Sequence, residues 1–301
     1  MKAEPFNMTK RSLLQELAKN FVPPNLLNLV PKGFEVIGGI AILNLPRELE
    51  EHKFEIAEAL LNYLKPRIRL VVRRSSPARD PERVHSYEVL AGSGGFETLH
   101  RESGCTFKVD VSKVFFTSRL QYERLRIANL VKPGETIINM FAGVGPFSIV
   151  IAKKVPGVKV YSIDINPEAY KLMVENVKLN KVEDKVIPLL GDAGEVIDQY
   201  DLKGIADRVL MPSPEHAINY LSKAVEALKV KGVVHYYDVA CQVKSLNDHL
   251  TSRISSILNG AGIKWEVRTI RVIRSVAPLK IYLCADVHLD KGLKLIAKQP
   301  F

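Results

Sequence analysis

The segment INMFAGVGPFSIVIAKK, residues 138–154, places Gly143 and Gly145 between two apolar runs. The first run is typical of a buried strand, and the second is typical of a helix. A strand, a glycine turn and a helix are the arrangement that brings backbone N–H groups close to a ligand at a switch point of an open α/β sheet. The segment therefore predicts an α/β fold with a ligand at this turn.

Beyond residue 135 the apolar runs alternate regularly between strand and helix patterns. This alternation predicts a mostly parallel sheet with helices on both faces. The segment 264–289 has two strand patterns and no helix between them, which predicts an antiparallel addition at the sheet edge. The expected strands are 136–141, 158–164, 185–190, 207–211 and 232–239, with helices after residues 147, 170 and 216 and across 245–262.

The first part of the chain has a different rhythm, and the change falls around residue 130. Short helical segments are expected before Pro23 and Pro24, a hairpin over 33–45 that turns at Gly38 and Gly39, and a helix over 50–64. Strand patterns follow at 67–76 and 105–116, and a helix at 117–131. We expect a smaller α+β domain over 1–110 and a catalytic domain over 111–301.

Composition limits the class of protein. The 301 residues are 47% hydrophobic and 25% charged, as in folded globular proteins. A net charge of +10 favours a polyanionic partner, although a solvated basic surface explains it as well. Three widely spaced cysteines indicate neither a disulfide framework nor a zinc site, so we expect no metal and a reducing cytoplasm. No apolar run is long enough for a membrane span.

Three ligands compete for the glycine turn. A triphosphate loop needs a lysine that this turn lacks, and a dinucleotide loop needs a third glycine where Ser148 stands. S-adenosylmethionine needs only close backbone approach at Ala142, Gly143 and Gly145. Asp164, 19 residues beyond Gly145, ends the next strand pattern and can accept from ribose hydroxyls. Asp192 follows the strand after that and can accept from the adenine amino group.

These residues belong to a pattern that resembles the archaeal and eukaryotic tRNA guanine-N1 methyltransferases, which modify position 37 of tRNA. The resemblance is carried by 138–149, 161–193, 83–92, 112–124, 207–217 and 232–239. It implies a class I methyltransferase Rossmann-like fold, S-adenosylmethionine as cofactor, and an extra domain in front that helps to hold the anticodon-loop region of tRNA. The implied cofactor contacts are Phe141, Ala142, Gly143, Val144, Gly145, Asp164, Ile165, Asp192, Ala193 and Pro212.

The resemblance also implies catalytic roles. Carried over by position, the arginine that steadies the target base is Arg83, and the general base is Glu123. Guanine N1 carries a hydrogen and is a poor nucleophile, so methyl transfer needs a base near N1 and a cation near O6. Without the resemblance, Glu123 reads as an exposed helix acid paired with a neighbouring arginine. Implied substrate contacts are Phe115, where relatives often have tyrosine, together with Arg119, Ser213 and Pro214.

One departure from the family concerns the loop after the fourth strand. Relatives usually have Asn-Leu-Pro there, whereas this chain has Pro212, Ser213 and Pro214. Proline offers no side-chain donor or acceptor, so the base must be recognised by other groups. The change is compatible with methylation of a tricyclic wyosine precursor at C7, alone or in addition to guanosine. Aminocarboxypropyl transfer is a further alternative, although Pro146 and Phe147 follow the methyl-transferring pattern.

A second departure is length: many relatives use a separate small N-terminal domain to contact the tRNA elbow, and we expect this chain to recognise tRNA without one. We expect a monomer that binds RNA through the basic run from Lys65 to Arg83 and through Arg268, Arg271 and Arg274. A catalytically silent RNA-binding protein is a competing hypothesis, and a small-molecule methyltransferase is another. The retained acids argue against the first, and the basic front domain argues against the second.

Overall fold

The structure is a computed structural model that describes residues 12–76, 83–241, 243–260, 262–277 and 279–292. The chain divides into two compact units. The N-terminal unit comprises residues 1–100 and 109–119, and the C-terminal unit comprises 101–108 and 120–301. Within the described part of the chain, no helix is both long and apolar enough to cross a membrane.

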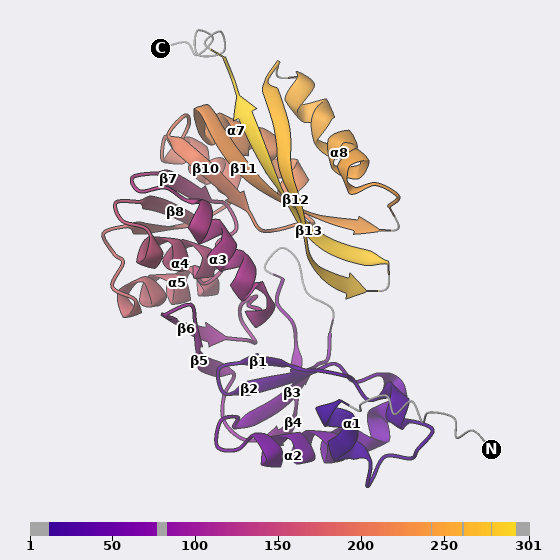
Figure 1. Ribbon diagram of the computed structural model, residues 1–301. Coiled ribbons are helices and arrows are strands. Elements are labelled where there is room, and N and C mark those ends of the chain that lie inside the picture. Colours follow the sequence, from indigo (N-terminus) through magenta and orange to yellow (C-terminus); the bar gives the residue numbers. More distant parts are fainter. Residues whose placement is uncertain (1–11, 77–82, 242, 261, 278, 293–301) are drawn as a thin grey trace, which may run out of the picture. The chain divides into compact units, whose positions relative to one another are not determined.

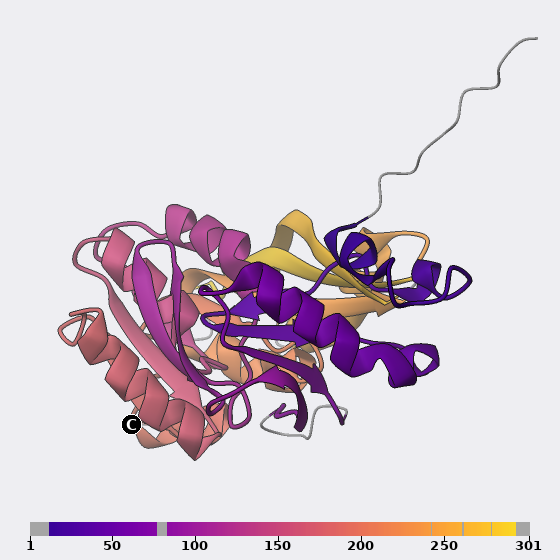
Figure 2. The same cartoon turned by 90° about the horizontal axis from the view of Figure 1, so that it is seen from below.

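The N-terminal unit is built on a four-stranded sheet in the order β1-β2-β3-β4. Strands β1 and β2 form the predicted hairpin, and Gly38 turns it with a positive φ of 52°. Strands β2 and β3 are parallel, so α2 crosses over between them and covers one face of the sheet (Figure 2). The bounds are α1 Leu13–Ala18, β1 Glu35–Ile37, β2 Ile40–Leu43, α2 Lys53–Leu64, β3 Leu70–Arg74 and β4 Tyr87–Gly92.

The core of this unit follows from the pattern of α2. Its residues Ile56, Ala57, Leu60 and Leu61 are buried at helical spacing and pack with the apolar side chains of β2 and β3. Phe54, on the same apolar pattern in the sequence, is instead 52% exposed. One side of an amphipathic helix thus closes the sheet, as the hydrophobic spacing predicts.

The C-terminal unit contains a seven-stranded sheet in the order β12-β13-β11-β10-β7-β8-β9 (Figure 1). The strands from β7 to β11 are parallel, and β13 and β12 are antiparallel additions at the edge. This confirms the predicted fold class. The bounds are β7 Thr136–Asn139, β8 Lys159–Asp164, β9 Val186–Leu190, β10 Ala206–Met211, β11 Leu228–Cys241, β12 Lys264–Ala277 and β13 Lys280–Asp290.

Helices cover this sheet in two groups. Helices α6, α7 and α8 share one apolar core with the strands, to which Val196, Leu221 and Ile254 contribute. Helix α3 packs along α4, and α4 and α5 pack on β8 and β9. The bounds are α3 Gln121–Leu130, α4 Pro146–Lys154, α5 Pro167–Leu179, α6 Ala193–Gln199, α7 Leu221–Ala227 and α8 Leu246–Gly260. The sequence pattern predicted these helices except α6, which is short.

The strand order creates a switch point between β7 and β10. From β7 the chain moves outward to β8 and β9, and it then returns to form β10 on the other side of β7. Ligands of open α/β sheets bind beyond the carboxyl ends of the strands at such a point. The glycine turn follows β7, and the loop at Pro212 follows β10. The topology therefore brings the predicted cofactor and substrate loops to one edge.

Strands β5 (Glu97–Glu102) and β6 (Cys105–Asp110) form a two-stranded sheet at which the division between the units falls. Asn176 of α5 and Asn180, the C-cap of that helix, hold β6 by its main chain. Asn180 accepts from the N–H of Thr106 and donates to its carbonyl, and Asn176 does the same at Lys108. These amide groups satisfy an edge that would otherwise be unpaired there.

Candidate active site

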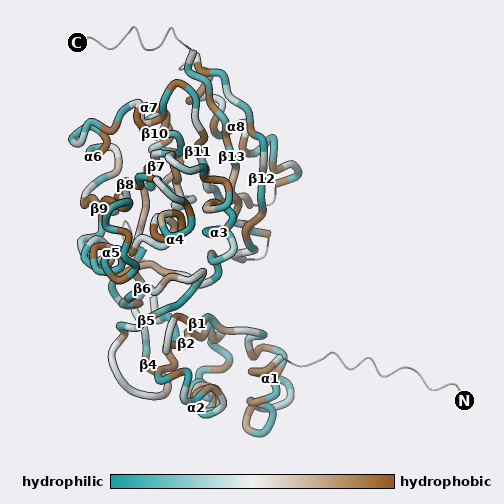
Figure 3. The backbone as a smooth tube through the Cα atoms, turned by 60° about the vertical axis from the view of Figure 1, so that its left-hand side comes forward, coloured by the Kyte–Doolittle hydropathy of each residue, from teal (hydrophilic) through white to brown (hydrophobic). Residues whose placement is uncertain are grey.

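The glycine turn is held by main-chain contacts and by positive φ angles. The Ala142 N–H donates to the Ile163 carbonyl of β8 at 2.8 Å, and Gly143 and Gly145 have φ of 57° and 88°. A Cβ on Gly145 would lie 3.1 Å from both Ile149 Cδ1 and Met173 Cγ. Only glycine fits this conformation and space without strain. Helix α4, hydrophobic in Figure 3, begins directly after the turn with Pro146 at its first position.

Ser148 stands where a dinucleotide loop would have its third glycine. It is fully buried and lies 3.1 Å from Asn139 Nδ2 and 2.7 Å from the Ser162 hydroxyl. It therefore joins β7, α4 and β8 by hydrogen bonds. The side chain has a structural use that a glycine could not supply, and this agrees with a ligand other than a dinucleotide.

Asp164 is oriented by two backbone N–H groups at the end of β8. Its Oδ2 accepts from Gly143 at 2.6 Å, and its Oδ1 accepts from Asn166 at 3.0 Å. An ionised carboxylate only accepts hydrogen bonds, and its two oxygens can do so in about four directions. That arrangement fits the two hydroxyls of a ribose. Ile165, the predicted neighbour, is 44% exposed and offers an apolar surface beside it.

Asp192 is the N-cap of α6. Its Oδ1 accepts from the N–H groups of Gly194 and Glu195 at 2.8 and 3.2 Å, and its Oδ2 accepts from the Tyr220 hydroxyl. That hydrogen bond, together with burial, raises the pKa of Tyr220 to about 12. Tyr220 also meets the Phe141 ring edge-to-face at 5.3 Å. These contacts link the residues that follow β7 and β9, and Ala193, the first residue of α6, is buried.

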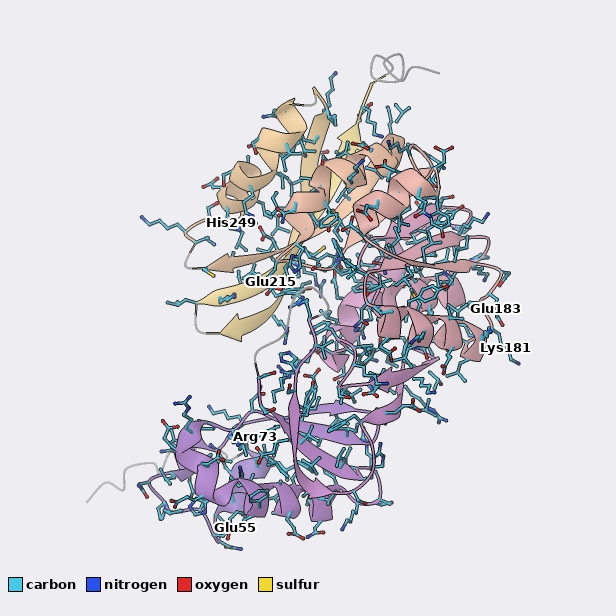
Figure 4. All side chains as sticks on the ribbon, turned by 180° about the vertical axis from the view of Figure 1, so that it is seen from behind. Glu55, Arg73, Lys181, Glu183, Glu215 and His249 are labelled. Atoms are coloured by element: carbon cyan, nitrogen blue, oxygen red, sulfur yellow. The ribbon has the colours of Figure 1, made fainter. Side chains whose placement is uncertain are left out.

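The loop at Pro212 is closed by its own main chain. Ser213 and Pro214 are buried and Pro212 is half-buried, while Glu215, labelled in Figure 4, is exposed. The Ser213 carbonyl accepts from the N–H groups of His216 and Ala217 at 3.1 and 2.7 Å. The Met140 N–H donates to the Leu210 carbonyl at 3.0 Å, which fixes this strand end beside the glycine turn. The loop is compact without the asparagine of the family pattern.

Glu123 is buried, with only 3% of its surface exposed. Arg126 donates to both carboxylate oxygens at 2.8 Å, and the Tyr237 hydroxyl donates to Oε1 at 2.8 Å. The pairing with a neighbouring arginine is therefore real, but the expected exposure is wrong. Burial raises the pKa of Tyr237 well above its usual range, so Tyr237 keeps the proton that it donates.

Behind Glu123 a row of polar groups runs through the sheet. Arg126 donates to Asp286 Oδ2 at 2.7 Å, and His235 Nδ1 lies 2.6 Å from Asp286 Oδ1. Burial alone would raise the pKa of Asp286, but the hydrogen bonds from His235 and Arg126 outweigh it and hold that pKa well below its usual range. The row continues through Arg208, which donates to His235 and to Glu135.

One group of side chains near this row has the composition of a metal site. His235, Cys284 and Asp286 offer ligand atoms within 4.8 Å of one another. Arg126 already donates to Asp286, and its Nη2 lies 3.4 Å from Cys284 Sγ. Burial also raises the pKa of the Cys284 thiol. A cation in this place and a protonated thiol both disfavour a metal ion, so we assign the group to the hydrogen-bonded row.

The N-terminal unit holds three other predicted residues. The Arg83 guanidinium lies over the Phe115 ring at 4.8 Å from its centroid, and Arg83 has a positive φ of 58°. Such a backbone conformation is uncommon outside glycine and clusters at functional sites. Arg119 is exposed and lies 3.9 Å from buried Glu35, which also accepts from Thr117. The structure thus brings Arg83 and Phe115 together within this unit.

The basic run from Lys65 to Arg83 is largely engaged within the unit. Arg69 donates to the carbonyls of Gly95 and Glu97 at 2.8 and 2.7 Å. Arg73, labelled in Figure 4, pairs with Glu50 and Glu88, and Arg74 pairs with Glu35 at 3.3 Å. Arg79 lies outside the described residues. These arginines stabilise the fold, so the positive charge left for a partner is smaller than the sequence suggests.

Sequence reasoning missed Arg126, Tyr237, His235 and Asp286. Signals for them exist in the sequence. Arg126 lies three residues after Glu123 on a helix, where side chains are neighbours. His235 and Asp286 interrupt the apolar stretches 233–237 and 281–287, and the register of β11 and β13 places them directly opposite each other. A polar residue inside a buried strand needs a partner, but a single sequence does not say which one.

A doubly wound sheet, a glycine turn after β7, an acid after β8 and a capped acid after β9 together define a class. The chain is an S-adenosylmethionine-dependent methyltransferase of the class I type.

The comparison with known families makes the assignment more specific. Residues 98–263 match the TRM5/TYW2 methyltransferase domain, and residues 14–95 match the TYW2 N-terminal domain. The chain belongs to this family. It is 39% identical over 269 residues to tRNA (guanine(37)-N(1))-methyltransferase Trm5b of Pyrococcus abyssi, covering 89% of this chain and 78% of the relative.

Other relatives span the reactions of the family. The chain is 37% identical to tRNA 4-demethylwyosine(37)-methyltransferase Taw21 of Saccharolobus solfataricus, covering 86% of this chain and 94% of the relative. It resembles the structure of aTrm5 in complex with tRNALeu, with a TM-score of 0.78, 33% identity, and 93% and 78% of the two chains covered. Methanocaldococcus jannaschii TYW2 in complex with AdoMet gives a TM-score of 0.66 at 28% identity, with 86% and 99% covered.

Proposed function

We propose that this enzyme transfers the methyl group of S-adenosylmethionine to N1 of guanosine 37 in tRNA. The family assignment and the Trm5b relative support the reaction. The observation that carries it in this chain is the place of Glu123. The Tyr237 hydroxyl donates to Glu123, and the centroids of the Tyr237 and Phe147 rings are 6.1 Å apart. Phe147 lies only two residues beyond Gly145 of the glycine turn. The buried carboxylate is thereby fixed close to the start of α4.

The proposed residues for the cofactor are those of the three strand ends. Asp164 accepts from the ribose hydroxyls, and the turn from Ala142 to Gly145 allows close backbone approach. Asp192 accepts from the adenine amino group, and Ile165 and Ala193 offer apolar surface to the ring. When bound, the cofactor supplies an electrophilic methyl group on a sulfonium.

Methyl transfer to N1 requires one general base, which accepts the proton that N1 loses. The N1–H bond of guanine breaks, and Glu123 takes the proton. The N1 electron pair forms the new N–C bond, and the pair of the broken C–S bond stays on sulfur. We assign Arg83 to O6, where negative charge develops as N1 loses its proton. Phe115 and Arg119 contact the substrate, and the loop from Pro212 to Pro214 holds the extruded base.

The test is methyl incorporation from labelled S-adenosylmethionine into tRNA transcripts with G or A at position 37, followed by nucleoside analysis. We expect N1-methylguanosine from the G37 transcript alone. Glu123→Gln should bind the cofactor normally and lose about 100-fold or more in single-turnover rate. Near-normal turnover by that variant would refute the role of Glu123. A protein that binds tRNA but no S-adenosylmethionine would instead be a silent RNA-binding relative.

A second candidate reaction is favoured by Pro212 and by the Taw21 relative, of which the chain covers 94%. A tricyclic wyosine precursor presents a different hydrogen-bonding edge from guanine, and Pro212 offers no side-chain donor to read one. Methylation at C7 of tRNA bearing that precursor, with no product from G37 transcripts, would establish this reaction in place of the first. An aminocarboxypropyl adduct in the same assay would identify the third reaction of the family.

We infer that tRNA is engaged at its anticodon-loop region by a monomeric enzyme in the cytoplasm. The exposed arginines Arg268 and Arg271 of β12 support a basic contact surface in the C-terminal unit. Sedimentation of the protein with and without tRNA tests the stoichiometry, and one enzyme per tRNA is the expected result.

A further inference from the structure

The acceptor positions of Glu123 are unevenly filled. Its Oε1 accepts two hydrogen bonds, from Arg126 Nη2 and from the Tyr237 hydroxyl. Its Oε2 accepts one, from Arg126 Nε. Since each carboxylate oxygen has about two lone-pair directions, Oε1 is saturated and Oε2 retains one position. A proton arriving at this carboxylate has its place on Oε2.

The spare position lies on the side where an exposed residue approaches. Arg271 of β12 is 54% exposed in its side chain, and its Nε lies 4.0 Å from Oε2. The groups that face Glu123 from the other elements are Tyr237 of β11 and the buried thiol of Cys284 on β13. A guanine that approaches Glu123 from the side of Arg271 therefore meets Oε2 first.

Arg126 sets this asymmetry because it is clamped between two carboxylates. Its Nε and Nη2 donate to Glu123, while Nη1 and Nη2 donate to Asp286 at 2.7 and 3.2 Å. A planar guanidinium with donors on both edges keeps one orientation under these bonds. Burial alone would lower the pKa of Arg126, but the hydrogen bonds from the two carboxylates raise it above its usual value.

Asp286 is fixed in turn by a histidine with a defined tautomer. Arg208 Nη1 lies 3.0 Å from His235 Nε2, and an arginine can only donate, so Nε2 is the acceptor. Burial lowers the pKa of His235, so the neutral ring carries its hydrogen on Nδ1 and donates it to Asp286. Three successive side chains are thereby oriented behind Glu123.

We propose that Arg126 is the positioning residue for the proton-accepting carboxylate and directs Oε2 of Glu123 toward N1 of the target guanine. Asp286 and His235 hold Arg126 in place. The proton lost from N1 resides on Oε2, while Arg126 and Tyr237 keep Oε1 occupied. This inference rests on the proposed function, because it takes Glu123 as the base.

The experiment compares Arg126→Lys with Arg124→Lys, its neighbour on α3. The Arg124 side chain is 3% exposed against 15% for Arg126, and Arg124 donates to both oxygens of Glu102, whereas Arg126 donates to both oxygens of Glu123. Both variants keep the charge and lose a buried guanidinium, so both should lose thermal stability. Single-turnover rates on G37 transcripts, corrected for the folded fraction, should fall about 100-fold for Arg126→Lys and stay within about threefold for Arg124→Lys.

Further readouts separate positioning from loss of structure. The dissociation constants for S-adenosylmethionine and tRNA should be unchanged in Arg126→Lys, and the rate should be lower at every pH without a shift of the pH midpoint, because the positive charge remains. Asp286→Asn should reduce the rate about tenfold through its effect on Arg126, and it serves in place of Arg126→Lys if that variant does not fold. Tyr237→Phe should reduce the rate only a few-fold.

Two results would overturn this inference and leave the proposed function standing. In the first, wild type is active and Arg126→Lys is as fast as Arg124→Lys. In the second, Tyr237→Phe is faster than wild type. The second would show that Oε1 takes the proton once Tyr237 no longer occupies it. Wild-type protein that is inactive on G37 transcripts would refute the proposed function itself, and the inference would fall with it.

Discussion

Asp164→Asn is the most direct test of the cofactor site, because both oxygens of this side chain have defined partners. They accept from the N–H groups of Gly143 and Asn166 at 2.6 and 3.0 Å. Asparagine keeps one acceptor oxygen and replaces the other by an amide that donates. One of the two backbone N–H groups must then face another donor.

The expected losses of stability and of cofactor affinity follow from the number of hydrogen bonds that the substitution removes. Losing one hydrogen bond to a charged group costs about 1.5–3 kcal/mol, so the free energy of unfolding of the ligand-free protein should fall by about that amount. The ribose diol loses one charged acceptor in the same way. At about 1.4 kcal/mol for each factor of ten, the dissociation constant for S-adenosylmethionine should rise about 10- to 100-fold.

Isothermal titration with S-adenosylmethionine and denaturant unfolding measure the two effects separately. Asp184→Asn is the matched control, because Asp184 is an exposed acid of the same unit. Its affinity and stability should stay at the wild-type values. A dissociation constant for Asp164→Asn within twofold of wild type would show that the ribose is not bound at this carboxylate.

Three other predictions concern the C-terminal unit. Glu102→Gln should lower the free energy of unfolding by about 3–5 kcal/mol, because it leaves the buried Arg124 guanidinium with a neutral partner. Urea unfolding measures this loss, and a value below about 1 kcal/mol would contradict the prediction. Asn176→Leu removes the amide that donates to both the Lys108 and Val144 carbonyls, so amide hydrogen exchange at the glycine turn should accelerate. Unchanged protection of these amides would show that Asn176 does not stabilise the turn. The depressed pKa of Asp286 contributes stability that is complete above the unfolded value of about 3.9 and is lost as the pH falls below it; the acid unfolding curve of Asp286→Asn should be flatter there than that of wild type.

The positions of the residues proposed to bind the cofactor were predictable from the sequence. Gly143, Gly145, Asp164 and Asp192 each follow a strand pattern directly, and the carboxyl ends of parallel strands meet at one edge of a sheet. Their positions therefore follow from local spacing together with the alternation of strands and helices. The structure adds the groups that orient them, notably Tyr220 on Asp192.

The surroundings of Glu123, the proposed base, were less predictable. The resemblance to a family pointed to Glu123, but the residues alone favoured an exposed acid. Its burial arises because β11 and β13, more than 100 residues further along the chain, bring Tyr237 and Asp286 to α3. Likewise the arginines from Arg69 to Arg74 appear in sequence as a basic run, and only their partners show that they are used within the fold.

The sequence by itself determined the order of strands and helices, the glycine turn and the acids that follow each strand, because these depend on residues close together in the chain. Only the tertiary structure decided which buried polar groups pair with one another. Hydrogen bonds between side chains such as Arg126 and Asp286 depend on which strands become neighbours, and that choice is made by the packing of the whole sheet.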